Sequence, residues 1–371
     1  MSKYKFAVLF QSNENNHGFK NTLLLSNNES DLSLNNDFNK IIFINYDYKN
    51  ELEHFLLKHT NPLNFPKKLQ IAVEEIVPIK EFTFEESKVS SPQLSIHATI
   101  SKEKYLENVN MLKHHIQQGD IYEINYCMTF EAKDVVIDPL QIYQKLNSIS
   151  KAPYSALAKF DHLYIISSSP ELFLSKRGNK LITKPIKGTA KRGSTTIEDE
   201  QLKQTLVNDL KERTENVMIV DVARNDLSRI AKKGSVTVEK LCDIETYEQV
   251  HQMVSTVSCE LKDKTSFDDI IEATFPMASM TGAPKIRAME LIDEYELYNR
   301  GPYSGALGYI DEKGDFELSV LIRSIFYDEQ KRYLSFTVGS AITAMCNAED
   351  EYNECLLKAK AMMEVLGNKV I

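Results

Sequence analysis

Cysteine is scarce and scattered in this 371-residue chain, which has five cysteines and no Cys-x-x-Cys pair. This pattern argues against a disulfide framework and against a zinc site. Long apolar runs are also missing: the first 16 residues are too polar for a signal peptide, and no segment approaches the length of a membrane span. We therefore expect a reduced, cytoplasmic protein with no membrane partner.

Positive charge is in deficit, because 44 lysines and arginines face 53 aspartates and glutamates and leave a net charge of −9. Such a balance argues against nucleic acid as a partner. A small anionic substrate is still compatible with it, since one cationic site can exist on an acidic protein. The apolar content of 42% and the length of the chain suit a globular protein with one large domain or two.

Repeats and low-complexity tracts are absent, and runs of strands alternate with helices, which predicts an α+β fold. We expect strands at residues 6–10, 41–44, 71–73, 121–130, 163–167, 172–176, 179–182, 250–261, 305–310, 316–326 and 333–338. Helices are expected at 101–118, 198–230 (as one helix or two), 286–294 and 348–366. We expect an N-terminal β-rich region over residues 1–95, packed on the same core as the remainder (96–371), with a connector near 85–92.

One lysine is expected to project from a rigid turn. In the stretch Thr183-Lys-Pro-Ile-Lys-Gly-Thr189, Pro185 fixes its own φ and Gly188 allows a sharp turn or a close approach to a ligand. If Lys187 is desolvated there, or set near another cation, it loses its proton and becomes an amine nucleophile. The commoner alternative is a solvated loop lysine.

Three glutamates are candidates for acid and metal chemistry. Glu171 lies at a strand junction between apolar neighbours, where a carboxyl group can stay protonated near neutral pH and act as a general acid. Glu215 and Glu354 lie on expected helices and would supply the few oxygen ligands that Mg²⁺ prefers. The alternatives are an exposed edge-strand position for Glu171 and, for Glu354, an ordinary helical pair with Lys358.

Three further features suit an anionic ligand. The loop from Ser279 to Lys285 leads into a helix whose N-terminus would attract an anion, although the spacing is not that of a P-loop. Backbone N–H groups at Gly339 and Ser340, after a strand, could bind a carboxylate. Arg323 interrupts an apolar strand, so we expect a carboxylate partner for it.

Taken together and in this order, these pieces resemble the chorismate-utilising enzymes, a family that includes anthranilate, aminodeoxychorismate, isochorismate and salicylate synthases. The resemblance covers the chain from about residue 101 onward and implies large antiparallel sheets in a two-layer sandwich flanked by helices. The segments that carry it are Gly119–Tyr122, Ser169–Glu171, Pro185–Thr189, Glu215–Leu227, Thr281–Glu290, Tyr303–Tyr309, Ile322–Ser324 and Glu351–Glu354.

Position 187 separates subgroups of this family: anthranilate synthases carry Ala there, whereas aminodeoxychorismate synthases carry Lys, as this chain does. The resemblance implies that uncharged Lys187 attacks C2 of chorismate as the C4 hydroxyl leaves, and that ammonia then attacks C4 and expels the lysine. It also implies that Glu171 is the general acid and that Glu215 and Glu354 hold Mg²⁺ at the ring carboxylate. The residues that it implies for the second carboxylate and the remaining anionic site are Arg323, Tyr309, Gly339, Ser340, Thr189, Ser279 and Lys358.

Two positions depart from the family pattern. Glu123 stands where Gln is usual and where isochorismate synthases have Lys, so isochorismate formation is not expected. A pairing of Glu123 with Lys187 or with another cation is one interpretation. Gln252 stands where His is common, which leaves open whether the neighbouring His251 compensates.

The source of ammonia is a further expectation. No cysteine lies in a Gly-x-Cys-x-Gly elbow and no segment is left over for a glutaminase domain, so we expect a separate glutamine amidotransferase subunit, or free ammonia, to supply nitrogen. The product would then be 4-amino-4-deoxychorismate, for 4-aminobenzoate and folate biosynthesis. The alternatives are an anthranilate synthase component I and a catalytically weak, chorismate-binding scaffold for an amidotransferase.

Overall fold

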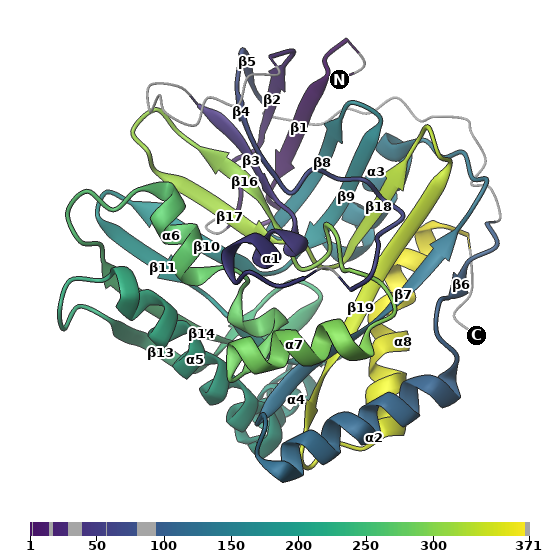
Figure 1. Ribbon diagram of the computed structural model, residues 1–371, viewed down its shortest axis with the longest axis vertical. Coiled ribbons are helices and arrows are strands. Elements are labelled where there is room, and N and C mark those ends of the chain that lie inside the picture. Colours follow the sequence, from purple (N-terminus) through teal and green to yellow (C-terminus); the bar gives the residue numbers. More distant parts are fainter. Residues whose placement is uncertain (2, 15–17, 29–38, 57, 80–93, 368–371) are drawn as a thin grey trace.

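The computed structural model describes residues 1, 3–14, 18–28, 39–56, 58–79 and 94–367. Two large antiparallel sheets pack across a shared apolar core, and helices cover their outer sides and ends (Figure 1). This arrangement confirms the expected α+β architecture. In the described residues, no helix is long and apolar enough to cross a membrane.

The first sheet has the strand order β15-β7-β19-β18-β9-β8-β1-β2-β5, with β6 also paired to β7. Its strands are β1 (Phe6–Gln11), β2 (Thr22–Ser26), β5 (Glu75–Pro78), β6 (His97–Ala98), β7 (Glu123–Ala132), β8 (Tyr154–Phe160), β9 (Leu163–Ser169), β15 (Gly282–Ala283), β18 (Ser324–Asp328) and β19 (Tyr333–Thr343).

The second sheet has the order β12-β14-β11-β10-β17-β16-β3-β4, with β13 also paired to β14. Its strands are β3 (Lys40–Ile44), β4 (Lys68–Ala72), β10 (Leu172–Arg177), β11 (Lys180–Thr183), β12 (Ile186–Lys191), β13 (Thr237–Thr246), β14 (Val250–Glu260), β16 (Ala306–Ile310) and β17 (Phe316–Val320).

The helices are α1 (Lys49–Leu52), α2 (Lys102–Gln118), α3 (Pro139–Ser150), α4 (Thr196–Asn208), α5 (Leu210–Ile230), α6 (Phe267–Thr274), α7 (Lys285–Tyr295) and α8 (Ala348–Val365), with two short 3₁₀ turns, η1 (Tyr46–Tyr48) and η2 (Ala278–Met280). Local sequence sets their ends. Ser101 caps α2 by accepting the Lys104 N–H, and Gly119 ends that helix with φ of 83°. Asp209 separates α4 from α5, so the expected helical stretch is two helices.

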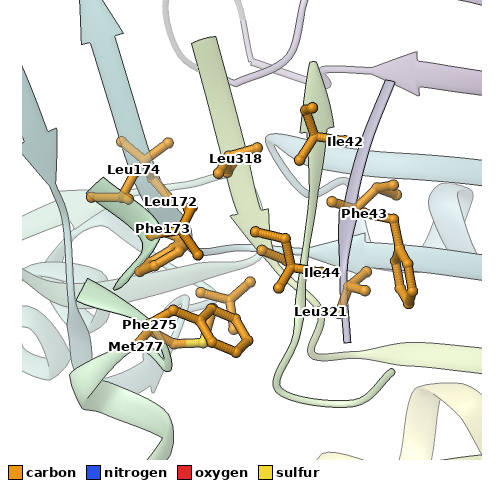
Figure 2. Packing of buried hydrophobic residues seen from close by; sticks show 14 of the residues in the cluster. Ile42, Phe43, Ile44, Leu172, Phe173, Leu174, Phe275, Met277, Leu318 and Leu321 are labelled. Atoms are coloured by element: carbon orange, nitrogen blue, oxygen red, sulfur yellow. The ribbon is translucent and has the colours of Figure 1, made fainter. Parts of the chain in front are cut away.

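The core has two parts, one between the sheets and one under the helices α2, α3 and α8. Figure 2 shows a section of the first part, where Leu172 and Leu174 of β10 and Leu318 of β17 lie near Phe275 and Met277. Burying each such side chain stabilises the fold by about 1.5–3 kcal/mol. This packing holds the second sheet, with its catalytic candidates, in a fixed position.

The N-terminal strands belong to both sheets. β1 pairs with β8 in the first sheet, and β3 pairs with β16 in the second. The described strands β1 and β3 of the N-terminal region are therefore built into the same two sheets as the later strands. The expected connector near residues 85–92 lies outside the described residues.

The expectation of one strand over residues 316–326 is wrong. The chain leaves the second sheet after β17, turns through Leu321–Arg323, and enters the first sheet as β18. Arg323 has a left-handed backbone with φ of 51°, which breaks the extended conformation. Both halves are apolar because each lies inside a sheet, so the hydrophobic pattern alone does not reveal the crossing.

Candidate active site

Two crossings between the sheets meet at one point. Glu171 lies at the crossing from β9 to β10, and Arg323 at the crossing from β17 to β18. The Val320 N–H donates to the Glu171 carbonyl at 3.1 Å, and the Ser168 N–H donates to the Arg323 carbonyl at 3.1 Å. These bonds bring together two candidate residues that are far apart in sequence.

Glu171 is a buried carboxyl group with one close hydrogen bond. The Ser279 hydroxyl, on η2, donates to Glu171 Oε1 at 2.6 Å. Burial raises the pKa of Glu171 to about 7, against the opposing effects of the Ser279 hydrogen bond and the Lys187 charge. The carboxyl group can therefore carry a proton near neutral pH, as a general acid must.

Lys187 extends from the strand β12, and not from the rigid turn that the sequence predicts. The pairing of β12 with β14 shifts register between Ile186 and Thr189, and Gly188 has φ of 87°. Any side chain at Gly188 would meet Leu206 and Glu212 at 3.1 Å, so glycine lets the helices approach the strand here. The Lys187 side chain is only 11% exposed, which rules out a solvated loop lysine.

The Lys187 amine lies 2.5 Å from Glu123 Oε1, and the Glu123 side chain is 1% exposed. Burial by itself would lower the pKa of Lys187, but the charges of Glu123 and Glu215 outweigh it and the pKa lies above its ordinary value. The expectation of an uncharged amine is thus wrong for the structure without ligands. The open question about Glu123 is answered, because it pairs with Lys187.

Glu215 and Glu354 approach the same pair of lysines from α5 and α8. The charges of Lys187 and Lys211 act on both carboxyl groups. Burial raises the pKa of Glu215 to about 8. Burial opposes ionisation of Glu354 too, but its ion pair with Lys358, at 2.6 Å, holds the pKa of Glu354 below its ordinary value.

Buried carboxylate oxygens without hydrogen-bond partners point to a cation at this place. They are Glu215 Oε1 and Glu351 Oε2, and the Lys211 amine lies 3.9 Å from the first and 2.8 Å from the other oxygen of Glu351. Leaving such oxygens unpaired is costly, and a divalent ion would satisfy them. In the described part of the chain, no three acidic, His or Cys side chains converge into a complete cage. Glu354 contributes none of these oxygens, since its carboxylate pairs with Lys358 at 2.6 Å, and the binding of Mg²⁺ by Glu215 and Glu354 stays a prediction.

Arg323 keeps its guanidinium free of carboxylates. Within the residues that the structure describes, its contact is a 3.4 Å hydrogen bond to the Lys358 carbonyl, and the expected carboxylate partner from this chain is not found. Burial lowers the pKa of Arg323, and Tyr303 and Glu354 act against that. A half-buried guanidinium that forms no ion pair within the described residues suits a carboxylate supplied by a ligand.

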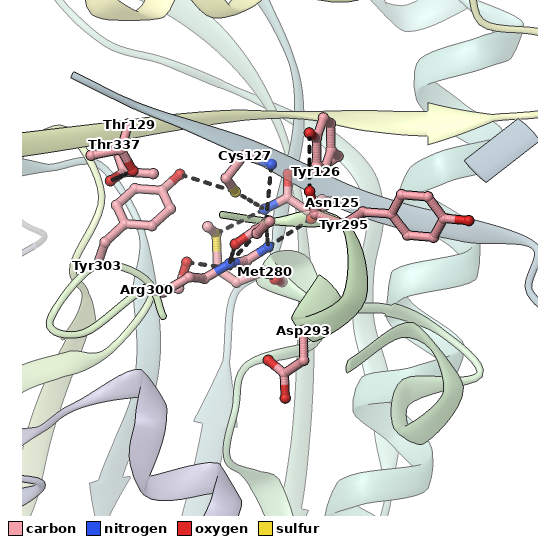
Figure 3. A network of polar contacts seen from close by, with 12 residues as sticks. Asn125, Tyr126, Cys127, Thr129, Met280, Asp293, Tyr295, Arg300, Tyr303 and Thr337 are labelled. Carbon is pink, nitrogen blue, oxygen red and sulfur yellow. Dashed lines mark hydrogen bonds and ion pairs between the residues drawn. The ribbon is translucent and has the colours of Figure 1, made fainter. Parts of the chain in front are cut away.

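The sequence predicts that Tyr309 binds the second carboxylate, but its ring is packed away from Arg323. Its ring packs against Phe10 at 5.7 Å and Phe19 at 6.2 Å, in the core between the sheets. Tyr303, which the sequence reasoning missed, is instead the tyrosine that lies close enough to Arg323 to interact with it electrostatically. Its hydroxyl lies 4.0 Å from Cys127 Sγ, in the polar network of Figure 3.

That network explains why Tyr303 is fixed in place. Arg300 is buried and donates to Glu296, to the Asn125 carbonyl and to the Met280 carbonyl (Figure 3). It thereby ties the loop before β16 to β7 and η2. Tyr303 and Tyr309 are the two ends of one segment that resembles the family, and the sequence of this segment does not show which tyrosine faces the site.

The remaining anion-site candidates lie on β19, α8 and β12. Lys358 Nζ donates to the Gly339 carbonyl at 2.8 Å, and the Ser340 hydroxyl is 3.1 Å from the Tyr105 hydroxyl. The pairing of β18 with β19 ends at Phe336, whereas β7 pairs with β19 over its whole length. Within the described sheet, Gly339 and Ser340 therefore have a neighbouring strand, β7, on one side only. Thr189 is exposed on β12, opposite Gln252. Their roles toward a ligand stay predictions.

His251 does not compensate for Gln252. His251 Nε2 lies 3.0 Å from Asp199 Oδ1, and its Nδ1 lies 2.9 Å from the Thr246 hydroxyl, so both ring nitrogens are engaged. Adjacent residues of a strand point to opposite faces. Gln252 Oε1 is buried without a hydrogen-bond partner and is left for a ligand or a water.

Comparison with known proteins gives consistent matches. A family model described as chorismate binding enzyme matches residues 7–364. The chloroplastic aminodeoxychorismate synthase of Arabidopsis thaliana is 42% identical over 266 residues, which are 70% of this chain and 28% of that protein. Anthranilate synthase component 1 of Aquifex aeolicus is 38% identical over 269 residues, 72% of this chain and 54% of that protein. The chain thus spans between about a quarter and a half of these curated relatives.

Solved structures agree on the fold. Anthranilate synthase component I from Streptococcus pneumoniae TIGR4 superposes with a TM-score of 0.76 at 25% identity, covering 96% of this chain and 92% of that one. The menaquinone-specific isochorismate synthase MenF from Escherichia coli superposes with a TM-score of 0.76 at 15% identity, covering 97% and 88%. At that identity the second match concerns the fold alone.

Proposed function

Because this chain belongs to the chorismate binding enzyme family, we propose that it is an aminodeoxychorismate synthase component, which converts chorismate and ammonia to 4-amino-4-deoxychorismate. The observation that carries the proposal is the buried Lys187 amine, held among carboxyl groups and close enough to Glu171 for their charges to interact. A nucleophilic lysine is the residue that forms a covalent bond to the ring in this reaction.

The first half-reaction uses three side chains. Glu123 accepts a proton from the Lys187 ammonium, and the free amine then attacks C2 of the ring. Glu171 donates its proton to the C4 hydroxyl, which leaves as water, because hydroxide is a poor leaving group without an acid. The Lys187–Glu123 pair and the Glu171–Ser279 pair lie away from solvent, so bulk water is excluded from the covalent intermediate.

The second half-reaction restores them. Ammonia attacks C4 and lysine leaves C2 as a neutral amine, which takes its proton back from Glu123. The Glu171 carboxylate takes a proton from the new C4 ammonium group. Protons and electrons therefore balance over the cycle, and the net change is the replacement of the hydroxyl by an amino group with release of water.

Binding falls to the remaining residues. Glu215 and Glu354 would hold Mg²⁺, which, when bound, neutralises the ring carboxylate and orients it. Arg323 forms no ion pair with a carboxylate of the described residues and would pair with the second, enolpyruvyl carboxylate, with Tyr303 beside it. Ammonia would come from a separate glutamine amidotransferase or from solution, and the product would feed 4-aminobenzoate and folate biosynthesis.

Product analysis tests the proposal. The chain is incubated with chorismate, Mg²⁺ and ammonium, and the products are separated and identified by mass. We expect 4-amino-4-deoxychorismate, and Lys187→Ala should lower kcat at least about 100-fold by removing the nucleophile. The matched control is Lys184→Ala, which removes a neighbouring lysine that pairs with Glu245 at 3.0 Å. An equal loss in both variants would assign Lys187 a structural role only.

A second candidate is anthranilate synthase component I, which the likeness to relatives of that name favours. It would place nitrogen at C2 and release pyruvate, so fluorescent anthranilate as the product would decide for it. A catalytically weak scaffold is the third reading, and measurable turnover with ammonium alone would exclude it.

A further inference from the structure

A small cavity of about 20 Å³ adjoins Glu171 and Ser279. Within the described residues, its lining does not include Lys187, Glu215, Glu354 or Arg323, so it is distinct from the proposed chorismate site. Its volume is enough for one water-sized molecule, since a water needs roughly 10–15 Å³ measured in this way. The Glu171 carboxyl group thus belongs both to this cavity and to the proposed chorismate site.

The walls of the cavity are largely apolar. They come from β10, the chain between β11 and β12, the second half of α5 and the stretch from the end of α6 to η2, and they include Leu172, Phe173, Leu174, Ala223, Leu227 and Met277. Such walls favour a small neutral guest over an ion.

The polar groups on the wall are mostly used within the protein. Asp226 forms a buried ion pair with Lys285 at 2.5 Å, and the Thr274 hydroxyl donates to the Ile270 carbonyl at 2.7 Å. The Ser279 hydroxyl donates to Glu171 at 2.6 Å, and both of these residues line the cavity. A guest would therefore make its hydrogen bonds at the Glu171 end.

We infer that this cavity binds the ammonia molecule that reacts at C4, an assignment that rests on the proposed function. Glu171 protonates the C4 hydroxyl, so C4 lies next to Glu171 when the substrate is bound. Once the hydroxyl has left as water, ammonia moves past the same carboxyl group and its lone pair forms the bond to C4. The C2–Nζ bond to Lys187 breaks, and the Glu171 carboxylate takes the surplus proton from the C4 ammonium group.

Filling the cavity tests the inference. Ala223 is a buried residue of α5 that lines the space, and Ala223→Leu would occupy the volume of the guest. With free ammonium as the nitrogen source, we expect KM for ammonium to rise about tenfold, as for loss of one well-bound small ligand, while KM for chorismate stays within about twofold. Saturating ammonium should restore kcat. If the leucine variant does not fold, Ala223→Val gives the same test with less added volume.

The matched control is Ala231→Leu, since Ala231 is also buried, directly follows α5 and does not line the cavity. It should leave both KM values unchanged. An unchanged KM for ammonium in a folded Ala223 variant, or an equal rise in both KM values, would overturn the inference and leave the cavity as a water site. Absence of 4-amino-4-deoxychorismate from the products of the unaltered protein would instead overturn the proposed function, and the inference with it.

Discussion

Lys187 on β12 and Glu123 on β7 form a buried ion pair, with 2.5 Å between Nζ and Oε1. The two residues come from different sheets and are 64 positions apart in the sequence. The pair keeps the lysine charged until a substrate is present, and it supplies the acceptor for the proton that the lysine must lose. Glu123 Oε2 has no hydrogen-bond partner, so the carboxyl group can hold that proton without displacing another donor.

Replacing Glu123 by Gln should expose this function. Gln keeps the size and a hydrogen bond but cannot accept the proton. We expect kcat at pH 7 to fall about 100-fold, the usual effect of removing a general base, and to recover partly toward pH 9 as Lys187 loses its proton to solvent. The pH profile of kcat measures both effects.

The control for this variant is Glu131→Gln, because Glu131 is an equally buried carboxyl group on the same strand and bonds to Tyr333. It should change kcat little. A Glu123→Gln enzyme with the unaltered rate and profile would contradict the assignment of Glu123 as proton acceptor.

Glu171 should make folding stability depend on pH. Its pKa is about 7 in the folded protein, against an ordinary value of 4.5. As pH rises through this window the unfolded chain releases the proton and the folded one does not, so stability present below pH 4.5 is lost up to pH 7, by about 3 kcal/mol at most. Glu171→Gln carries no such charge and should be more stable than the unaltered protein at pH 8 but not at pH 4.5.

Urea unfolding at the two pH values, without Mg²⁺, measures the difference. The same variant should lose most of its turnover, since Gln cannot protonate a leaving hydroxyl. Equal stability differences at both pH values would mean that Glu171 is ionised in the folded protein, and its role as general acid would then be untenable.

The fold was largely predictable because it rests on local patterns. The caps at Ser101 and Gly119 and the alternation of apolar residues locate α2 and most strands. What the sequence could not provide are relationships across the sheets. The stretch that contains Arg323 is apolar on both sides, so the crossing between sheets is invisible in it. The pairing of Glu123 with Lys187 depends in the same way on a contact between distant strands.

Mg²⁺ should stabilise the folded chain through Glu215. Burial raises the pKa of Glu215 to about 8, so protons compete with the metal and the affinity should fall as pH drops from 8 to 6. At a concentration about 100 times the dissociation constant, Mg²⁺ should stabilise by about 2.7 kcal/mol, and a chelator should reverse this. Thermal unfolding with and without Mg²⁺ provides the measurement.

Two variants on α5 make that experiment specific. Glu215→Gln should abolish the stabilisation by Mg²⁺, whereas Asp221→Asn, at an exposed position of the same helix, should keep it. If both variants respond to Mg²⁺ like the unaltered protein, the ion binds elsewhere and the orphaned oxygens have another explanation.

The two tyrosines at either end of one sequence segment should behave differently. Tyr303 acts electrostatically on Arg323, the cation proposed for the enolpyruvyl carboxylate, while Tyr309 is packed against Phe10 and Phe19 in the core. Tyr303→Phe removes one hydroxyl beside the carboxylate and should raise KM for chorismate by about tenfold, the value of a hydrogen bond to a charged group. Tyr309→Phe should leave KM for chorismate unchanged, because the buried Tyr309 hydroxyl has no hydrogen-bond partner.

Arg323→Ala sets the scale for these effects. Removing the cation itself should raise KM for chorismate more than removing the Tyr303 hydroxyl does, and initial rates over a range of chorismate concentrations give KM for all three variants. A rise in KM for Tyr309→Phe alone would return the carboxylate to the site first expected from the sequence.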